Sequence, residues 1–509
     1  MSLAISCLDT RYFKDVKDLI NVCDEYAYYR NRIYVELKYF ELFTSSTITY
    51  NPLTDFTYND YLEILKTEDI LRHDVKAIEY FIKDIPEVKD TLKSHLVHIG
   101  LTSQDVNSLG FMICFRDSSF IILETLNNLI NIFTTQLITP YVDKTNDILM
   151  LSFTHGKPAT PTHFSKEMLI YKTRLENIYN EMNTFIKTEL TVKFGGATGE
   201  FNSLKIALPD TNWQKWADHF IEGFSYEGFS YEGFSYEGFS YEGFSPSSSL
   251  VHEASSLDPE HSLAPEHSLA PEHSLTPDKL TPSRPSKSCL NVLRAGFSKF
   301  CFRRTQYTNQ CDNYDSVINL LYMMKRMLHI LEHLRCNLWL YIHRDYFIQK
   351  NIKTEIGSST MPQKINPIDL ENAKTAIEMA KRMIDGICDI LTETSYQRDI
   401  SDSSALRNVS SIFGYILITL KKITSGISRL TPNIKKIKEE LNEHPEVILE
   451  GIQTYLKIHC NIENSYEMMK DISRGNTLTL MDIYCMIDKL DIDDIHKIRL
   501  KTLTPETYY

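Results

Sequence analysis

The stretch from Gly357 to Pro367, GSSTMPQKINP, combines two serines, a lysine and an asparagine in a segment that cannot continue a helix. Proline lacks the backbone donor that a helix needs, and glycine is conformationally too permissive. Its backbone N–H groups, hydroxyls and Lys364 could bind an anion, or a serine beside the lysine could act as a base or nucleophile. Taken alone, the loop is better explained as a polar connection between helices.

Further polar clusters stand at the ends of expected helices. A helix is expected to begin at Arg72, His73 and Asp74, where unpaired N–H groups favour anions. Another helix is preceded by Thr102 and Ser103, and capping alone explains these two residues. A glycine and two prolines follow Thr154 and His155, so the histidine is expected on a bend.

Arginines nine residues apart flank several serines between Tyr396 and Asn408. The forked guanidinium group and short hydroxyl donors suit a phosphate. An exposed, capped helix start would explain the same residues. The candidates are Arg398, Ser403 and Arg407.

The composition is that of an ordinary soluble protein of 509 residues, with 42% hydrophobic residues and a net charge of -13. This acidic balance argues against a nucleic-acid-binding surface. Ten cysteines without a CxxC pair or a Cys/His cluster predict neither a metal site nor a disulfide framework. Polar residues interrupt every long apolar window, so we expect no membrane span and a cytoplasmic location.

Almost every element that must position these residues is expected to be a helix. Apolar residues recur with helical spacing, no alternating strand pattern is found, and the fold class is therefore all-α. The longest segment is apolar on several sides, which is typical of a helix inside a bundle. Helices are expected over 15–43, 60–70, 103–137, 162–192, 315–346 and 368–391, in domains 1–103, 104–394 and 395–509.

Residues 222–300 form a different kind of sequence, with four copies of YEGFS and three PEHSL[AT] units. Units this short, each with Gly or Pro, cannot bury a helical face. We expect a flexible, low-complexity insertion of about 70 residues. His261, His267 and His273 recur with the repeat, and repeat expansion explains them better than metal binding.

GSSTMPQKINP resembles the signature G-S-S-x-M-P-x-K-x-N-P of the fumarase/aspartase superfamily at every fixed position. The other segments resemble the bacterial-type branch of the adenylosuccinate lyase family, outside about 222–300. The resemblance implies a long-helix bundle and a homotetramer whose active sites are shared between subunits, with no cofactor. The matching segments are Arg11-Tyr12, Arg72-His73-Asp74, Thr102-Ser103, Thr154-His155-Gly156, Tyr307 to Gln310 and Arg398 to Arg407.

The resemblance also implies a reaction and a role for each residue. The reaction removes fumarate from adenylosuccinate to give AMP, and from the succinylated aminoimidazole-carboxamide ribonucleotide. His155 would be the general acid and Ser358 the base, while His73 would hold the substrate and orient His155. Asp74 would lie near the base or ribose, with Arg72 and Thr154 in the same site. The succinyl part would be held by Thr102, Ser103, Gln310, Lys364 and Asn366, and the phosphate by Arg11, Tyr12, Arg398, Ser403 and Arg407.

Three residues depart from the family pattern: Lys157 replaces a usual Gln, Phe153 a frequent Arg, and Gln104 a frequent Glu. They flank the proposed catalytic groups without removing any. A sister lyase, such as argininosuccinate lyase, fumarase or aspartase, would share Ser358 but would need no phosphate cradle. A weakened homologue that serves as a scaffold through its repeats is the other alternative, and retention of His155, Ser358 and Lys364 favours an enzyme.

Overall fold

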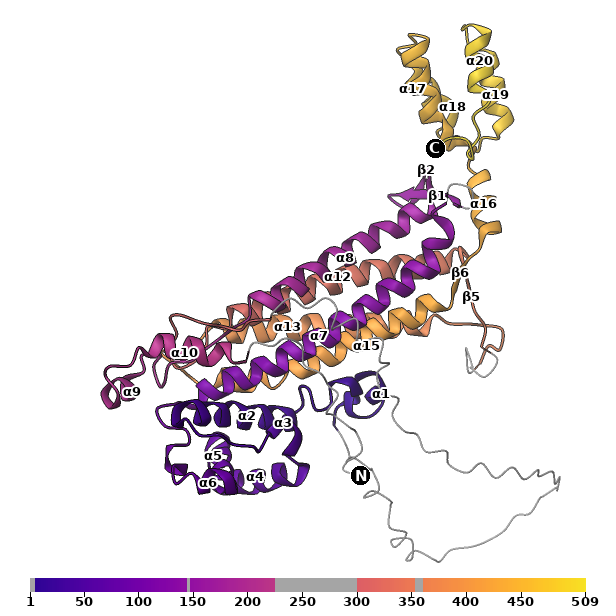
Figure 1. The fold of residues 1–509 in the computed structure, drawn as a ribbon. Coiled ribbons are helices and arrows are strands. Elements are labelled where there is room, and N and C mark those ends of the chain that lie inside the picture. Colours follow the sequence, from indigo (N-terminus) through magenta and orange to yellow (C-terminus); the bar gives the residue numbers. More distant parts are fainter. Residues whose placement is uncertain (1–4, 144–146, 225–299, 353–359) are drawn as a thin grey trace, which may run out of the picture.

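The computed structural model describes residues 5–143, 147–224, 300–352 and 360–509. Long helices form a bundle, with smaller helical groups at both ends (Figure 1). The helices are α1 Phe13–Val16, α2 Glu25–Thr44, α3 Pro52–Asp55, α4 Tyr58–Leu71, α5 Asp74–Asp84, α6 Pro86–Asp90, α7 Ser103–Leu137, α8 Phe164–Thr188, α9 Asn202–Ala207, α10 Trp213–Glu222, α12 Asp315–His343, α13 Ile368–Thr392, α14 Ser401–Leu406, α15 Val409–Ser428, α16 Ile434–Asn442, α17 Leu449–His459, α18 Ser465–Ser473, α19 Leu480–Asp488 and α20 Asp494–Leu500. The strands are β1 Leu149–Thr154, β2 Lys157–His163, β3 Thr191–Val192, β4 Arg303–Arg304, β5 Phe347–Gln349 and β6 Leu430–Pro432.

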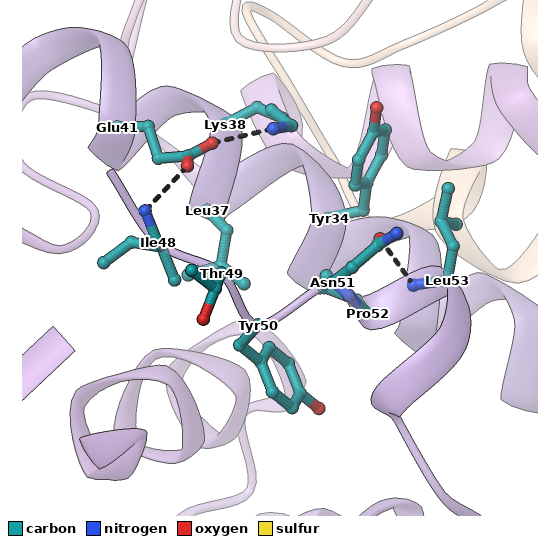
Figure 2. Close-up of a pocket in the computed structure, with 10 residues that line it drawn as sticks. All are labelled: Tyr34, Leu37, Lys38, Glu41, Ile48, Thr49, Tyr50, Asn51, Pro52 and Leu53. Carbon is teal, nitrogen blue, oxygen red and sulfur yellow. Dashed lines mark hydrogen bonds and ion pairs between the residues drawn. The ribbon is translucent and has the colours of Figure 1, made fainter. Parts of the chain in front are cut away.

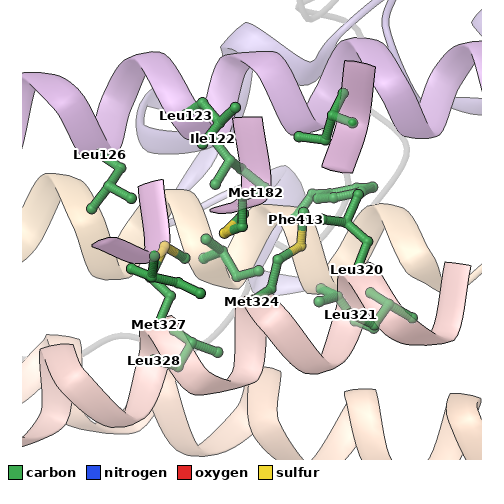
Figure 3. Packing of buried hydrophobic residues seen from close by; sticks show 14 of the residues in the cluster. Ile122, Leu123, Leu126, Met182, Leu320, Leu321, Met324, Met327, Leu328 and Phe413 are labelled. Carbon is green, nitrogen blue, oxygen red and sulfur yellow. The ribbon is translucent and has the colours of Figure 1, made fainter. Parts of the chain in front are cut away.

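The bundle consists of α7, α8, α12, α13 and α15. Helix α13 packs against α15 and α12, and α7 packs against α15, α8 and α2. Figure 3 shows Leu126 of α7, Met182 of α8 and Met324 of α12 in the shared core. Each helix contacts several neighbours, and this explains why their apolar residues cover more than one side. The predicted long-helix bundle is confirmed.

Helix α7 begins and ends at the predicted residues, Ser103 and Leu137. The segment Ser103–Tyr141 is long and apolar enough to cross a membrane, but 83% of its most apolar window is buried inside the protein. Packing against the neighbouring helices therefore accounts for its composition. Within the described ranges, no other helix has that length and apolarity.

The predicted single helix over 15–43 is wrong, because the chain breaks it between Val16 and Glu25. A short 3-10 turn follows α1, and Asn21 adopts a positive φ of 61°. Asp24 then caps α2, accepting hydrogen bonds from the N–H groups of Asn21 at 2.9 Å and Ala27 at 2.8 Å. Capping by the aspartate ends the turn and starts the long helix.

The sequence predicted no strands, yet three small two-stranded sheets are present among the described residues. Strands β1 and β2 form an antiparallel hairpin that encloses His155 and Gly156, both with positive φ. A two-residue turn of this kind matches the twist of the flanking strands. Strand β2, KPATPTH, contains two prolines and only one buried residue, so it has no alternating apolar pattern.

Two smaller hydrophobic cores flank the bundle. One unites α2 with α4, α5 and α6 through Ile33, Ile64 and Ile78, and the other lies mainly between Leu441 and Leu500. Helix α15 belongs to the bundle core, although the predicted C-terminal domain begins before it, at residue 395. The boundaries between the three domains stay a prediction. The repeats of the expected insertion fall in residues 225–299, outside the described part of the chain.

Candidate functional site

Most of the predicted site residues of one chain lie in two groups at opposite ends of the bundle (Figure 1). The 35 residues of α7 separate the groups by roughly 50 Å at the usual helical rise. The α7-start group comprises Arg72, His73, Asp74, Thr102, Ser103, Gln310, Arg398, Ser403 and Arg407. The hairpin group comprises Thr154, His155, Lys364 and Asn366, and Ser358 lies outside the described residues.

A row of hydrogen bonds connects the α7-start group across three separate segments. The side-chain amide of Gln310 donates to Thr102 Oγ1 at 3.3 Å, and Arg398 Nη1 donates to Gln310 Oε1 at 3.4 Å. Arg398 Nη2 donates to Ser403 Oγ at 3.5 Å. Hydrogen bonds of this length are weak, so the N–H and O–H groups of this row stay available to bind an anion.

Asp74 of the α7-start group contacts two arginines, Arg32 of α2 and Arg407. Its Oδ2 atom lies 2.6 Å from Arg32 Nη1 and 3.3 Å from Arg407 Nη2, and Arg407 also contacts Glu25. Burial raises the pKa of the Asp74 carboxyl, but the charge and hydrogen bond of Arg32 outweigh burial and hold this pKa below its ordinary value. Asp74 is therefore a carboxylate that positions Arg407.

Arg32 is a buried residue that the sequence reasoning missed. Its guanidinium lies 4.2 Å from the ring centres of both Tyr28 and Tyr29. A Cβ atom at Gly110 of α7 would lie 2.9 Å from Arg32 Cγ, so only glycine fits where α2 meets α7. The lone glycine of the α7 sequence was the available signal for this close approach.

We expect Arg32→Met to destabilise the folded protein by about 3–5 kcal/mol, because it leaves Asp74 without its main partner in a partly buried place. The matched control is Arg326→Met, which breaks the half-exposed pair with Glu181 and is expected to cost about 1 kcal/mol or less. Chemical unfolding of both variants measures the difference. Equal losses of stability would contradict the structural role of Arg32.

His73 caps α5 and presents the rest of its ring to solvent. Its Nδ1 atom accepts a hydrogen bond from the Lys76 N–H at 3.2 Å, and its side chain is 54% exposed. An acceptor at Nδ1 places the proton of the neutral ring on Nε2. His73 can therefore donate a hydrogen bond from Nε2 to a ligand or to a second ring.

A buried ion pair holds the start of α7 in place. Lys193 Nζ lies 2.6 Å from Asp105 Oδ1, and Asp105 also accepts from the N–H groups of Thr102, Gly195 and Gly196. Burial lowers the pKa of Lys193, although Asp105 opposes this shift. The Asp105 carboxylate thus joins the backbone of Thr102 to the close-packed bend at Gly195 and Gly196.

The hairpin group lies on exposed loops. His155 occupies the hairpin turn with φ 53°, and Thr154 and Lys157 beside it are also exposed. Phe153, one of the family departures, packs under the Arg344 guanidinium, 3.9 Å from its ring centre. Phe153 therefore supports the hairpin through packing.

The described part of the signature loop, residues 360–367, lies at the same end as the hairpin. Gln349 of β5 donates to the carbonyl of Ile365 at 3.2 Å, and the ring of Phe347 in β5 meets Phe164 at the start of α8. Lys364 is exposed and Asn366 half-buried. This loop and the hairpin both lie where α8 begins.

Arg11 and Tyr12 lie apart from both groups, beside α15. Tyr12 packs with Leu8 and Ile418, and Arg11 is exposed. No contact described for these two residues joins them to Arg398 or Arg407. Their predicted role in phosphate binding stays a prediction.

A pocket of about 320 Å³ lies between α2 and residues 48–53 (Figure 2). Tyr34, Lys38, Glu41 and Tyr50 are among its lining residues, and no predicted site residue lines it. Within the described residues, no group of three or more His, Cys, Asp or Glu side chains is arranged to hold a metal ion.

Comparisons with known protein sequences show the family of this chain. A model of the lyase family matches residues 48–224 and 287–383, and a model described as adenylosuccinate lyase C-terminal matches residues 394–509. Adenylosuccinate lyase of Dictyostelium discoideum is 30% identical, over 99% of this chain and 96% of the relative. Adenylosuccinate lyase of Escherichia coli (strain K12) is 28% identical over the same shares.

Two solved structures support the fold. Fumarate lyase from Mesorhizobium sp. BNC1 has a TM-score of 0.65 at 10% identity, over 97% of this chain and 94% of that one. The 3-carboxy-cis,cis-muconate lactonizing enzyme from Pseudomonas putida has a TM-score of 0.62 at 11% identity, over 99% and 96%. The all-α fold of the fumarase/aspartase type is confirmed, and the chain belongs to the adenylosuccinate lyase family of lyases.

Proposed function

We propose that this lyase releases fumarate from adenylosuccinate and from the succinylated aminoimidazole-carboxamide ribonucleotide, as a step of purine biosynthesis. The observation that carries the proposal is the row Thr102, Gln310, Arg398 and Ser403, next to Arg407. Its amide and hydroxyl groups suit the carboxylates of a succinyl group, and its guanidinium groups suit a phosphate.

The reaction needs three events. A base removes a proton from the carbon next to a carboxylate, the resulting negative charge is stabilised, and an acid protonates the leaving nitrogen. In this proposal Ser358 is the base, and Lys364 and Asn366 stabilise charge from the signature loop. His155 is the acid, because histidine exchanges protons near neutral pH.

The two groups of site residues lie too far apart to act together within one chain. A second copy would bring its hairpin group to the α7-start group of the first. We therefore propose a homotetramer in which different subunits complete each active site. A cytoplasmic location and the absence of a cofactor belong to the same proposal.

The substrate is tested by incubating the purified protein with adenylosuccinate and, separately, with argininosuccinate. Ultraviolet absorbance follows fumarate, and chromatography identifies the other product. We expect fumarate and AMP from the first substrate and no fumarate from the second, with Ser358→Ala as an inactive blank. Cleavage of argininosuccinate would instead support the sister lyase. A folded tetramer that cleaves neither would support a scaffold that acts through the repeats.

A further inference from the structure

The Asp402 carboxylate lies beneath the row of site residues, in the first turn of α14. Its Oδ2 atom accepts hydrogen bonds from Gln104 Nε2 at 2.9 Å and from the Tyr314 hydroxyl at 2.7 Å. Its Oδ1 atom accepts from the N–H group of Ser403 at 2.7 Å and from the Ser403 hydroxyl at 3.4 Å. Gln104, Tyr314 and Ser403 thus supply hydrogen bonds to both oxygens of this carboxylate.

This contact joins three elements away from solvent. Gln104 is in the first turn of α7 and is 1% exposed, Tyr314 precedes α12 and is 4% exposed, and Asp402 is 7% exposed. Tyr314 has φ 58°, a left-handed conformation disfavoured for residues with a Cβ atom. Burial, followed by the charge of Asp402, raises the pKa of Tyr314 well above its ordinary value. The hydroxyl therefore remains a donor.

We propose that Gln104 and Tyr314 are positioning residues for the phosphate-binding part of the site. Both bind Asp402 Oδ2, and the other oxygen of that carboxylate holds Ser403, which Arg398 contacts in turn. The inference rests on the proposed function in that it assumes that Arg398 and Ser403 hold the nucleotide phosphate.

Gln104 donates to Asp402 through its side-chain amide. An amide can donate to Asp402, whereas an ionised glutamate cannot. Gln104→Glu would place two carboxylates together in a buried site, where one retains its proton to an unusually high pH. The variant should therefore hold Asp402 correctly at low pH and lose that contact as the pH rises.

Other titratable groups near Asp402 also respond to pH, so the wild type is needed as a reference. Burial raises the pKa of Asp312 to about 6 and that of Cys311 to about 12. Lys193 and Arg398 are the cations near Cys311. The pH dependence that residue 104 causes is therefore measured as the difference in AMP affinity between the Gln104→Glu variant and the wild type.

Calorimetric titration of the full-length protein with AMP, and separately with inorganic phosphate, tests the proposal. We expect Gln104→Glu to bind AMP like the wild type near pH 5.5 and about tenfold more weakly near pH 8. Gln104→Met, which lacks both donor and charge, should bind more weakly than the wild type by the same factor at both pH values. Wild-type affinity of Gln104→Glu throughout this range would overturn the proposal.

Two further variants test the proposal if Gln104→Glu does not fold. The double variant Gln104→Glu/Asp402→Asn exchanges donor and acceptor, so the added pH dependence should disappear; its persistence would overturn the proposal. Tyr314→Phe should weaken phosphate binding severalfold without loss of the assembled protein, and unchanged binding would overturn the role of Tyr314. If the wild type binds phosphate but not AMP, the proposed substrate is wrong, while the phosphate titrations still test the positioning.

Discussion

His155→Asn is expected to lower kcat for adenylosuccinate by roughly 10²- to 10⁴-fold, the usual contribution of a general acid. The fold should survive, because His155 lies exposed at the hairpin turn with a positive φ. Asparagine tolerates this conformation, and Asn-Gly is a favoured pair in such turns. The variant thus removes the proton donor while it preserves the turn.

His163→Asn is the matched control on the same hairpin. His163 lies 3.1 Å from Asp147 and meets the ring of Tyr509, so its loss should affect stability more than kcat. Initial rates at saturating substrate, with melting curves for both variants, measure the two effects. A His155→Asn variant with wild-type kcat would exclude His155 as the acid.

His73→Asn is expected to lower kcat/KM by about 10²-fold, the lower end of the range for a positioned proton-transfer or hydrogen-bonding group. His73 Nδ1 is occupied by the cap of α5, which leaves Nε2 to face the ligand or His155 of another chain. Asparagine is a good cap residue, so the helix start is preserved while the imidazole is lost.

His73→Ala provides the comparison, because it removes the cap as well. It should lose about 1 kcal/mol of stability relative to His73→Asn, with a similar decrease in kcat/KM. Both variants should be measured by steady-state kinetics and thermal unfolding. A wild-type kcat/KM in His73→Asn would show that His73 acts only as the cap of α5.

The sequence predicts the bundle well, because long helices with apolar residues on several sides can pack in few other ways. Helix α7 matches its predicted range for this reason. The break before α2 was missed because Asp24 and Asn21 act through local hydrogen bonds that leave the apolar spacing almost unchanged. The hairpin was missed because β1 is short, and because β2 contains two prolines and only one buried residue.

The candidate site could be predicted as a set of residues but not as an arrangement. Thr102, Gln310 and Arg398 are each expected from motifs, and the structure brings them into contact. Chain order cannot show that His155 lies at the opposite end of α7, since that separation depends on the direction of the helices. Arg32 was missed because its partner Asp74 lies 42 positions away and is recognised only in the folded chain.

The most direct test of a lyase site shared between chains combines two variants of strongly reduced activity. His155→Asn and His73→Asn are mixed in equal amounts, unfolded and refolded together, and assayed with adenylosuccinate. If each site takes His155 from one chain and His73 from another, random assembly leaves roughly a quarter of the sites without either substitution. The account predicts recovery of about that fraction of wild-type activity, whereas no recovery in correctly assembled mixtures would contradict it.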